Sequence, residues 1–172
     1  MSLPRYRLIA VLVMALLCVM ASLGGTETKT EVQRPTLAGL PGGIVRVVHL
    51  DKEFEDKGVT EDRVLSDVEV RLRKAGIKVF TSMDDPKWES SGRPVLYTQM
   101  MMVRNGNCRA QRTDIWLSQQ ATLTRNSARV MATTWDVGVT GSGSVFDSRD
   151  SRNALGDLVD YFINDYLAVN PK

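Results

Sequence analysis

The sequence contains few of the residues that bind metals or form disulfides. It has one histidine and two cysteines among 172 residues, which excludes a multi-histidine or cysteine-rich metal site within one chain. It also has no long block of like charge, because its 22 basic residues are interspersed with 20 acidic ones. We therefore expect no nucleic-acid partner. Apolar residues make up 43% and charged residues 24% of the chain, which is the composition of one soluble globular domain.

The first 21 residues have the pattern of an export signal. Arg5 and Arg7 precede an unbroken apolar run over residues 8–21, and Ala21 is a small residue at the cleavage position. Basic, apolar and small residues in this order are typical of a secretory signal peptide. We therefore expect residues 1–21 to be removed from a periplasmic or secreted protein.

Two other fates of this segment are open. Extended by two residues, the apolar run 8–23 reaches the length of a marginal membrane span, so an uncleaved anchor in the inner membrane is one alternative. That anchor would be the only contact with a membrane. Lipidation at Cys18 is the other alternative, although Leu17 stands where lipidation motifs have a small residue.

Removal of the signal would leave a tether and one domain. Residues 22–43 are rich in glycine, threonine and proline and have no apolar period, which predicts a flexible tether. Residues 44–172 then form a single globular domain. Two of the 22 basic residues would be lost, so 20 basic residues would balance 20 acidic ones. Cys108 would be the only cysteine, so stability must come from core burial rather than from an internal disulfide.

Capping and periodicity signals divide the domain into strands and helices. Thr60 can cap a helix that Gly76 terminates, because acids in its first turn and bases in its last turn complement the helix dipole. An apolar stripe predicts a second helix over residues 151–168. β-Branched and alternating segments predict strands at residues 44–50, 77–80, 95–103, 108–117 and 129–139. Loops are expected at residues 51–58, 82–94 and 138–144.

The pair Asn105-Gly106 is the strongest local signal for a hairpin. A tight type I′ turn needs positive φ at both central residues, and this dipeptide adopts it readily. With these two residues as the turn, Val103 pairs with Cys108. The face of the hairpin that carries this pair is the more apolar one, so we expect it to lie under the helices. The opposite face is half polar and is expected to be open.

The predicted order of elements is β-α-β-β-β-β-α. The first helix crosses over between the first two strands, the later strands form an antiparallel meander, and both helices pack on one face. The expected fold is therefore an α/β (α+β) two-layer sandwich whose other face is open.

The run from Asp67 to Val79, followed by a strand meander and a terminal helix, resembles small bacterial periplasmic domains. Examples are the amino-terminal domain of the Tol-system translocation protein, the activator lipoproteins of penicillin-binding proteins and the curli-secretion lipoproteins. The resemblance covers residues 44–168 and implies a protein that binds partners rather than catalysing a reaction. It carries over no functional residue.

No arrangement of side chains predicts catalysis, a cofactor or a metal site. His49 is a strand-end residue near the surface and lacks the partners that a general base needs. Cys108 is expected to be a buried small hydrophobe. The acidic loop 51–58 lacks the ligand spacing of a calcium loop. Arginines gather in residues 95–135, where Asp114 is the only acid, and this imbalance favours an acidic partner.

The half-polar face of the hairpin is the candidate partner-binding surface. Met100 and Met102 offer adaptable apolar contacts, while Arg109 and Gln111 offer hydrogen bonds, and interface cores favour such a mixture. The alternative is that loop 82–94 covers this face. The partner is expected to be an envelope protein or an acidic polymer.

Three classes of function are compatible with these patterns. The leading hypothesis is a non-catalytic accessory protein of the bacterial envelope that binds a protein or polymer through its exposed sheet face. A membrane-tethered subunit of a larger envelope complex is one alternative, and it depends on an uncleaved signal. A small exported hydrolase is the other, because two carboxylates can meet in space without a sequence signature. A deep cleft would favour the hydrolase, and a flat sheet would not.

Overall fold

The computed structural model describes residues 29–105, 108–143 and 148–171. The predicted signal, residues 1–21, therefore lies outside the described residues, as does the loop between β3 and β4. Helix α2 (Lys29–Gln33) reaches the start of a compact unit that runs from Gln33 to Lys172. Within the described residues, no helix is long and apolar enough to span a membrane.

The compact unit is a five-stranded sheet with its two long helices on one side. Its helices are α3 (Lys52–Glu55), α4 (Glu61–Lys74), α5 (Pro86–Ser90) and α6 (Ser148–Val169), together with the 3-10 helix η1 (Arg34–Leu37). Its strands are β1 (Gly42–Leu50), β2 (Lys78–Val79), β3 (Val95–Asn105), β4 (Cys108–Thr122) and β5 (Arg129–Gly143).

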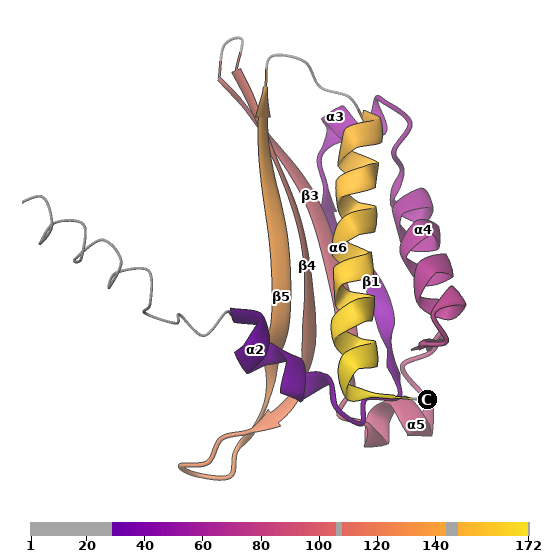
Figure 1. Cartoon of the computed structure of the whole chain (residues 1–172), viewed down its shortest axis with the longest axis vertical. Coiled ribbons are helices and arrows are strands. Elements are labelled where there is room, and N and C mark those ends of the chain that lie inside the picture. Colours follow the sequence, from indigo (N-terminus) through magenta and orange to yellow (C-terminus); the bar gives the residue numbers. More distant parts are fainter. Residues whose placement is uncertain (1–28, 106–107, 144–147, 172) are drawn as a thin grey trace, which may run out of the picture. The chain divides into compact units, whose positions relative to one another are not determined.

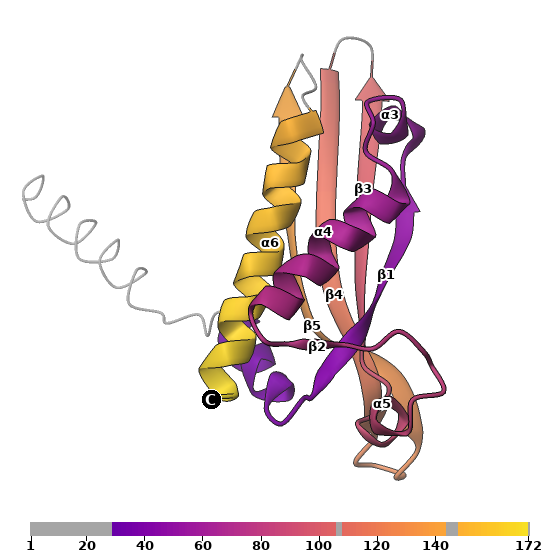
Figure 2. The same cartoon turned by 90° about the vertical axis from the view of Figure 1, so that its right-hand side faces the viewer.

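The strands lie in the order β2-β1-β3-β4-β5. β1 is parallel to both β2 and β3, whereas β3, β4 and β5 form an antiparallel meander. Helices α4 and α6 lie on the same face of the sheet (Figure 1), with α4 over β1 and α6 over β4 and β5 (Figure 2). The predicted two-layer α/β sandwich is therefore confirmed.

Both long helices form for the local reasons that the sequence indicates. The Thr60 hydroxyl accepts a hydrogen bond from the Arg63 N–H at 3.4 Å, which caps α4. Gly76 follows the helix at a φ of +83°, a conformation that glycine adopts without steric cost. The inner side of α6 buries an apolar stripe that includes Leu155, Val159 and Phe162.

The predicted tether ends earlier than expected. Leu37 is fully buried and Leu40 is 6% exposed, and both belong to the main hydrophobic core. Residues 33–43 are thus part of the folded unit, and the expectation of a flexible segment there is wrong. The glycine- and proline-rich composition of this segment predicts a loop, but Leu37 and Leu40 within it pack into the core. Only the tertiary structure shows this packing.

The hairpin is confirmed, but its predicted register is wrong. Asn105 pairs with Cys108 and Val103 pairs with Ala110, so the connection is residues 106–107 rather than Asn105-Gly106. Each residue of β3 pairs with a β4 residue two positions further along the chain than predicted. Because side chains alternate with a period of two, this shift leaves every side chain on its predicted face. Pairing along the strands sets the register.

The helices cover the face that the sequence analysis left open. Leu96, Met100 and Ile115 are each at most 2% exposed and belong to the main core beneath the helices. The assignment of the apolar hairpin face to the helices is therefore wrong. Both faces of β3 carry apolar residues, so alternation alone does not choose between them.

Two of the three expected loops contain helices, and the third is largely strand. Residues 51–58 include α3, residues 82–94 include α5, and β5 continues to Gly143. A proline at the first position of α5 and an Asp85 side chain that accepts from the Lys87 N–H at 2.8 Å start that helix. A second cluster, made of Ile44, Phe80, Trp88 and Val95, lies beside α5 on the open face. The alternative that loop 82–94 covers the face with Met100 and Met102 is wrong, because α4 and α6 cover that face and α5 lies against the opposite one.

Candidate functional site

The open face of the sheet presents two neighbouring rows of polar and aromatic side chains. Direct cross-strand pairing on β1, β3, β4 and β5 forms the first row from Arg46, Tyr97, Trp116 and Asp136. The second row, on the same four strands, consists of His49, Gln99, Asp114 and Gly138. The pleat places both rows on the side that α4 and α6 leave free.

Asp114 is the centre of a hydrogen-bond network on this face. Its carboxylate accepts from Arg112 Nε at 2.9 and 2.8 Å and from Gln99 Nε2 at 3.0 Å. The residue is only 8% exposed, and a buried charge is costly unless it is paired in this way. The hydrogen bond and the charge of Asp114 raise the pKa of Arg112 above its usual value, so the guanidinium stays charged.

Gly138 makes room for this carboxylate. A Cβ atom at position 138 would lie 2.0 Å from Asp114 Oδ1, closer than any side chain tolerates. The Asp114 carboxylate on β4 can therefore take its position only because residue 138 on β5 has no side chain. In this network the carboxylate of Asp114 is buried, while the Arg112 side chain is 60% exposed.

Trp116 provides an aromatic surface beside the network. Its ring stacks on Tyr97 with centroids 5.4 Å apart and an interplanar angle of 26°. Among the described residues, its indole N–H makes no hydrogen bond. A shallow hollow of about 450 Å³ opens next to it, lined by Gln99, Arg112, Asp114, Ile115, Trp116, Thr133, Asp136 and Val137.

The hollow combines two paired carboxylates with an aromatic ring and a guanidinium. Two carboxylates line it, but Asp114 accepts from Arg112 and Gln99, and Asp136 accepts from Gln33 Nε2 at 2.7 Å. A glycoside hydrolase needs two carboxyl groups free to act on the sugar and a water, whereas both carboxylates here are engaged by protein donors. What the hollow offers is a ring face, an indole donor and the remaining N–H groups of Arg112.

The four residues predicted as a partner-binding surface lie on the helix side. Met100 is 1% exposed and in the core, and Met102 packs against that core. Gln111 accepts a hydrogen bond from Ser151 Oγ of α6 at 2.7 Å. Arg109 follows the same alternation near the end of β4. The prediction of an open surface at these residues is therefore wrong.

Sequence reasoning missed the residues that do occupy the open face. Arg112, Asp114 and Trp116 alternate along β4, and this spacing of two is the signal that could have found them. Nothing in the sequence marks Gly138 as their partner, because the contact joins two strands through pairing.

The other predicted positions do not line this hollow. His49 is exposed, as expected, and its Nε2 lies 3.0 Å from Asp51 Oδ1. In the acidic segment, Lys52 and Asp56 pair at 2.5 Å. The Cys108 side chain lies outside what the structure describes. Among the described residues, no group of three or more His, Cys, Asp or Glu side chains could bind a metal ion.

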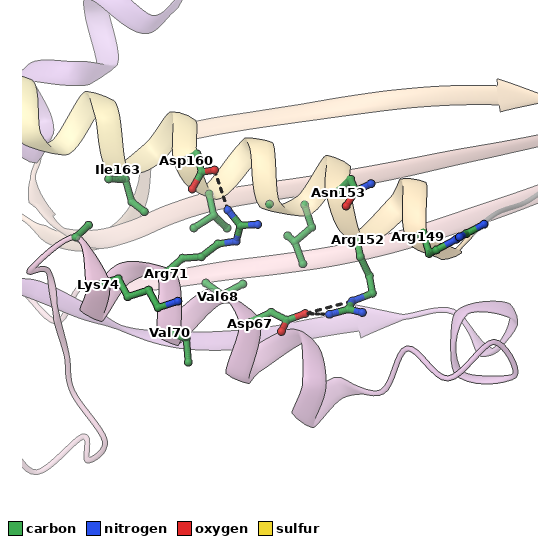
Figure 3. A pocket seen from close by; sticks show the side chains of 14 residues that line it. Asp67, Val68, Val70, Arg71, Lys74, Arg149, Arg152, Asn153, Asp160 and Ile163 are labelled. Atoms are coloured by element: carbon green, nitrogen blue, oxygen red, sulfur yellow. Dashed lines mark hydrogen bonds and ion pairs between the residues drawn. The ribbon is translucent and has the colours of Figure 1, made fainter.

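A second concavity, of about 850 Å³, lies between α4 and α6 (Figure 3). Ion pairs cross it: Arg71 Nη1 lies 2.7 Å from Asp160 Oδ2, and Arg152 Nη2 lies 2.5 Å from Asp67 Oδ2. These ion pairs join α4 to α6, so the charged side chains in the groove contribute to the packing of the two helices. Its exposed pairs add little to stability.

Comparison with known proteins identifies no family. No protein-family model and no curated protein matches the chain. Among solved structures, the PelC dodecamer from Paraburkholderia phytofirmans has 16% identity and a TM-score of 0.41, with 71% of this chain and 89% of that chain covered. A minor lipoprotein from Acinetobacter baumannii has 9% identity and a TM-score of 0.38, with 76% and 93% covered.

Lipoprotein GNA1162 from Neisseria meningitidis has 15% identity and a TM-score of 0.34, with 72% of this chain and 96% of that chain covered. Two of these three proteins are named as lipoproteins, but similarity at such scores supports no conclusion about function. The periplasmic families that the sequence resembles are not confirmed.

Proposed function

We propose that this protein is a non-catalytic accessory protein of the bacterial envelope that binds a protein or envelope polymer through the open face of its sheet. The observation that supports the proposal best is the Gln99–Asp114–Arg112 network beside Trp116. Core packing does not require this network, because α4 and α6 cover the opposite face. The space that Gly138 leaves for the Asp114 carboxylate supports a role for the arrangement itself.

The composition of this surface fits a binding role. Tryptophan, tyrosine and arginine dominate the residues that contribute most to interfaces, and Tyr97, Trp116 and Arg112 lie together here. Asp114 holds the Arg112 side chain in place, because the Nε–H donates to both of its carboxylate oxygens. Pre-ordering of this kind lowers the entropic cost of binding.

The alternatives predict different locations and activities. A tethered subunit depends on whether residues 8–23 are retained, and intact mass of the native protein tests that. A carboxylate hydrolase would need Asp114 or Asp136 to hold a proton, and both already accept hydrogen bonds from protein donors. The binding proposal requires neither condition.

Site-specific photocrosslinking in the native envelope tests the proposal. A photoreactive residue at Met101, which pairs with Arg112 on the open face, is expected to form a discrete adduct. The matched control is Val70 on α4, which is 43% exposed on the helix side. Equal adducts from both positions, or none from Met101, would contradict the proposal.

Tryptophan fluorescence gives a second readout for polymer partners. Trp88 and Trp135 are 6% and 1% exposed, so quenching by acrylamide reports chiefly on Trp116. Soluble fragments of an envelope polymer that bind the hollow should protect Trp116 from the quencher. Unchanged quenching with every fragment, together with a protein adduct at Met101, would assign the surface to a protein partner.

A further inference from the structure

The outer edge of β5 is a second interaction surface and is separate from the open face. β5 is the last strand of the sheet order, and within the described ranges its one strand neighbour is β4. An edge strand presents unpaired N–H and C=O groups that another strand can bind. The opposite edge is β2, which has only two residues.

The first part of this edge is already covered by the chain itself. The Asp136 N–H donates to Gln33 Oε1 at 3.1 Å, and the Thr134 carbonyl accepts from Thr36 Oγ1 at 3.2 Å. Gln33 Nε2 also donates to Asp136 Oδ1. Residues 33–36 thus act in place of a neighbouring strand along this stretch.

The second part of the edge, residues 137–143, has no such cover. Because the Asp136 N–H points outward, the two-residue period directs the N–H and C=O groups of Gly138, Thr140 and Ser142 outward as well. In the described part of the chain, no group bonds to these outward atoms. The segment VGVTGSG also has no charge and no proline, the devices by which edge strands usually prevent pairing.

We propose that this edge pairs with the same edge of a second copy of the chain, as an antiparallel β5–β5 contact centred on Thr140. In this register Thr140 lies opposite Thr140 of the other copy, Val139 lies opposite Gly141, and Gly138 lies opposite Ser142. Each of the three outward residues then donates one N–H and accepts one hydrogen bond. The proposal is independent of the function assigned to the open face.

The segment is complementary to itself. The larger Val139 meets a glycine, so no two bulky side chains compete for the same space. Paired threonines are favourable cross-strand neighbours, and no like charges face each other. A two-fold contact of this kind closes after two copies and does not propagate into a fibre. Because a few residues of edge bury less than a standard interface, the dimer should depend on protein concentration.

Sedimentation velocity on the isolated full chain tests the contact, with nonionic detergent present if residues 8–23 are retained. The wild-type chain is expected to shift from monomer to dimer as concentration rises. Thr140→Pro removes an outward N–H without breaking the β4 ladder, since proline is tolerated where the N–H faces solvent. It should weaken dimerisation by about tenfold or more, whereas Thr140→Val, which keeps the N–H, should not.

Disulfide trapping locates the contact. Opposed residues of a hydrogen-bonded antiparallel pair have Cα atoms about 5.5 Å apart, within the range that a disulfide spans. With Cys18 and Cys108 replaced by serine, Thr140→Cys should give a crosslinked dimer under mild oxidation. The control is Met131→Cys, also on β5 and 52% exposed.

Three results would overturn the proposal. These are a monomer at every concentration, a dimer that Thr140→Pro leaves unchanged, and equal crosslinking from positions 131 and 140. The first result would mean that the β5 edge, if it pairs at all, pairs with a strand of a different protein.

Discussion

Trp135 on β5 and Asp165 on α6 are joined by a buried hydrogen bond, in which the indole N–H donates to Oδ2 at 3.0 Å. The other carboxylate oxygen of Asp165 accepts from Arg34 Nε at 2.8 Å. One acid that is 3% exposed therefore joins the sheet, the last helix and the amino-terminal turn η1. This explains why residues 33–43 are part of the fold and not a tether.

Asp165→Ala is expected to lower the free energy of unfolding by about 3 kcal/mol, because it leaves the buried Trp135 N–H and the partly buried Arg34 without a partner. Asp160→Ala on the same helix is the matched control. Asp160 pairs with Arg71 at the surface, so its loss should cost less than about 1 kcal/mol. Chemical denaturation measures both, and equal losses would mean that the buried bond adds nothing.

Gly138→Ala should disturb the open-face network, because its Cβ would overlap Asp114 Oδ1. The expected loss of stability is about 1–3 kcal/mol from overpacking. In an Asp114→Ala background the same change should be nearly neutral, and this double-mutant cycle isolates the contact. Gly141→Ala is the control on the same strand, since its Cβ would meet only the flexible end of Gln111 at 3.3 Å. If the stability losses of Gly138→Ala and Asp114→Ala simply add, the two residues do not interact and this explanation of Gly138 is wrong.

Phe162→Ala should cost about 3–5 kcal/mol through lost apolar burial and a cavity. Phe162 is 3% exposed, and its ring meets that of Trp135 edge-on with centroids 5.0 Å apart. Asn164→Ala, on the exposed side of α6, should change stability by less than about 0.5 kcal/mol. Thermal unfolding of both variants measures the difference. An unchanged melting temperature for Phe162→Ala would show that α6 does not contribute to the core through this residue.

Tyr166 should make the fold sensitive to alkali. Burial raises the pKa of its phenol above the usual 10.0, and the hydroxyl donates to the Leu40 carbonyl at 2.5 Å. The folded state therefore holds this proton more tightly than the unfolded chain. The resulting stability is full below pH 10 and is lost as the pH rises through the folded-state pKa.

Tyr166→Phe should remove this alkaline dependence while losing one hydrogen bond at neutral pH. Denaturation midpoints at pH 8 and above pH 10 measure the effect. An identical alkaline loss in the wild type and the variant would assign the dependence to other groups.

Local signals in the sequence were sufficient for most of the secondary structure. The Thr60 cap, the dipole-complementing charges and Gly76 predicted α4 to within two residues at each end. The apolar stripe predicted α6, which extends over residues 148–169. Alternation and Asn105-Gly106 predicted the hairpin, although not its register. These features depend on residues that are close in the chain, and a single sequence contains that information.

The sequence by itself determined the element order and the two-layer class, because capping, turn and periodicity signals are local. Only the tertiary structure decided which face of the meander the helices cover and hence where a binding surface can lie. Met100 and Met101 have similar apolar character, so alternation does not separate their faces. A parallel β-α-β crossover is right-handed, and this three-dimensional handedness places α4 on the face of the sheet that carries Met100. The Asp114–Gly138 contact and the burial of Leu37 likewise join residues distant in sequence, and no local pattern encodes such contacts.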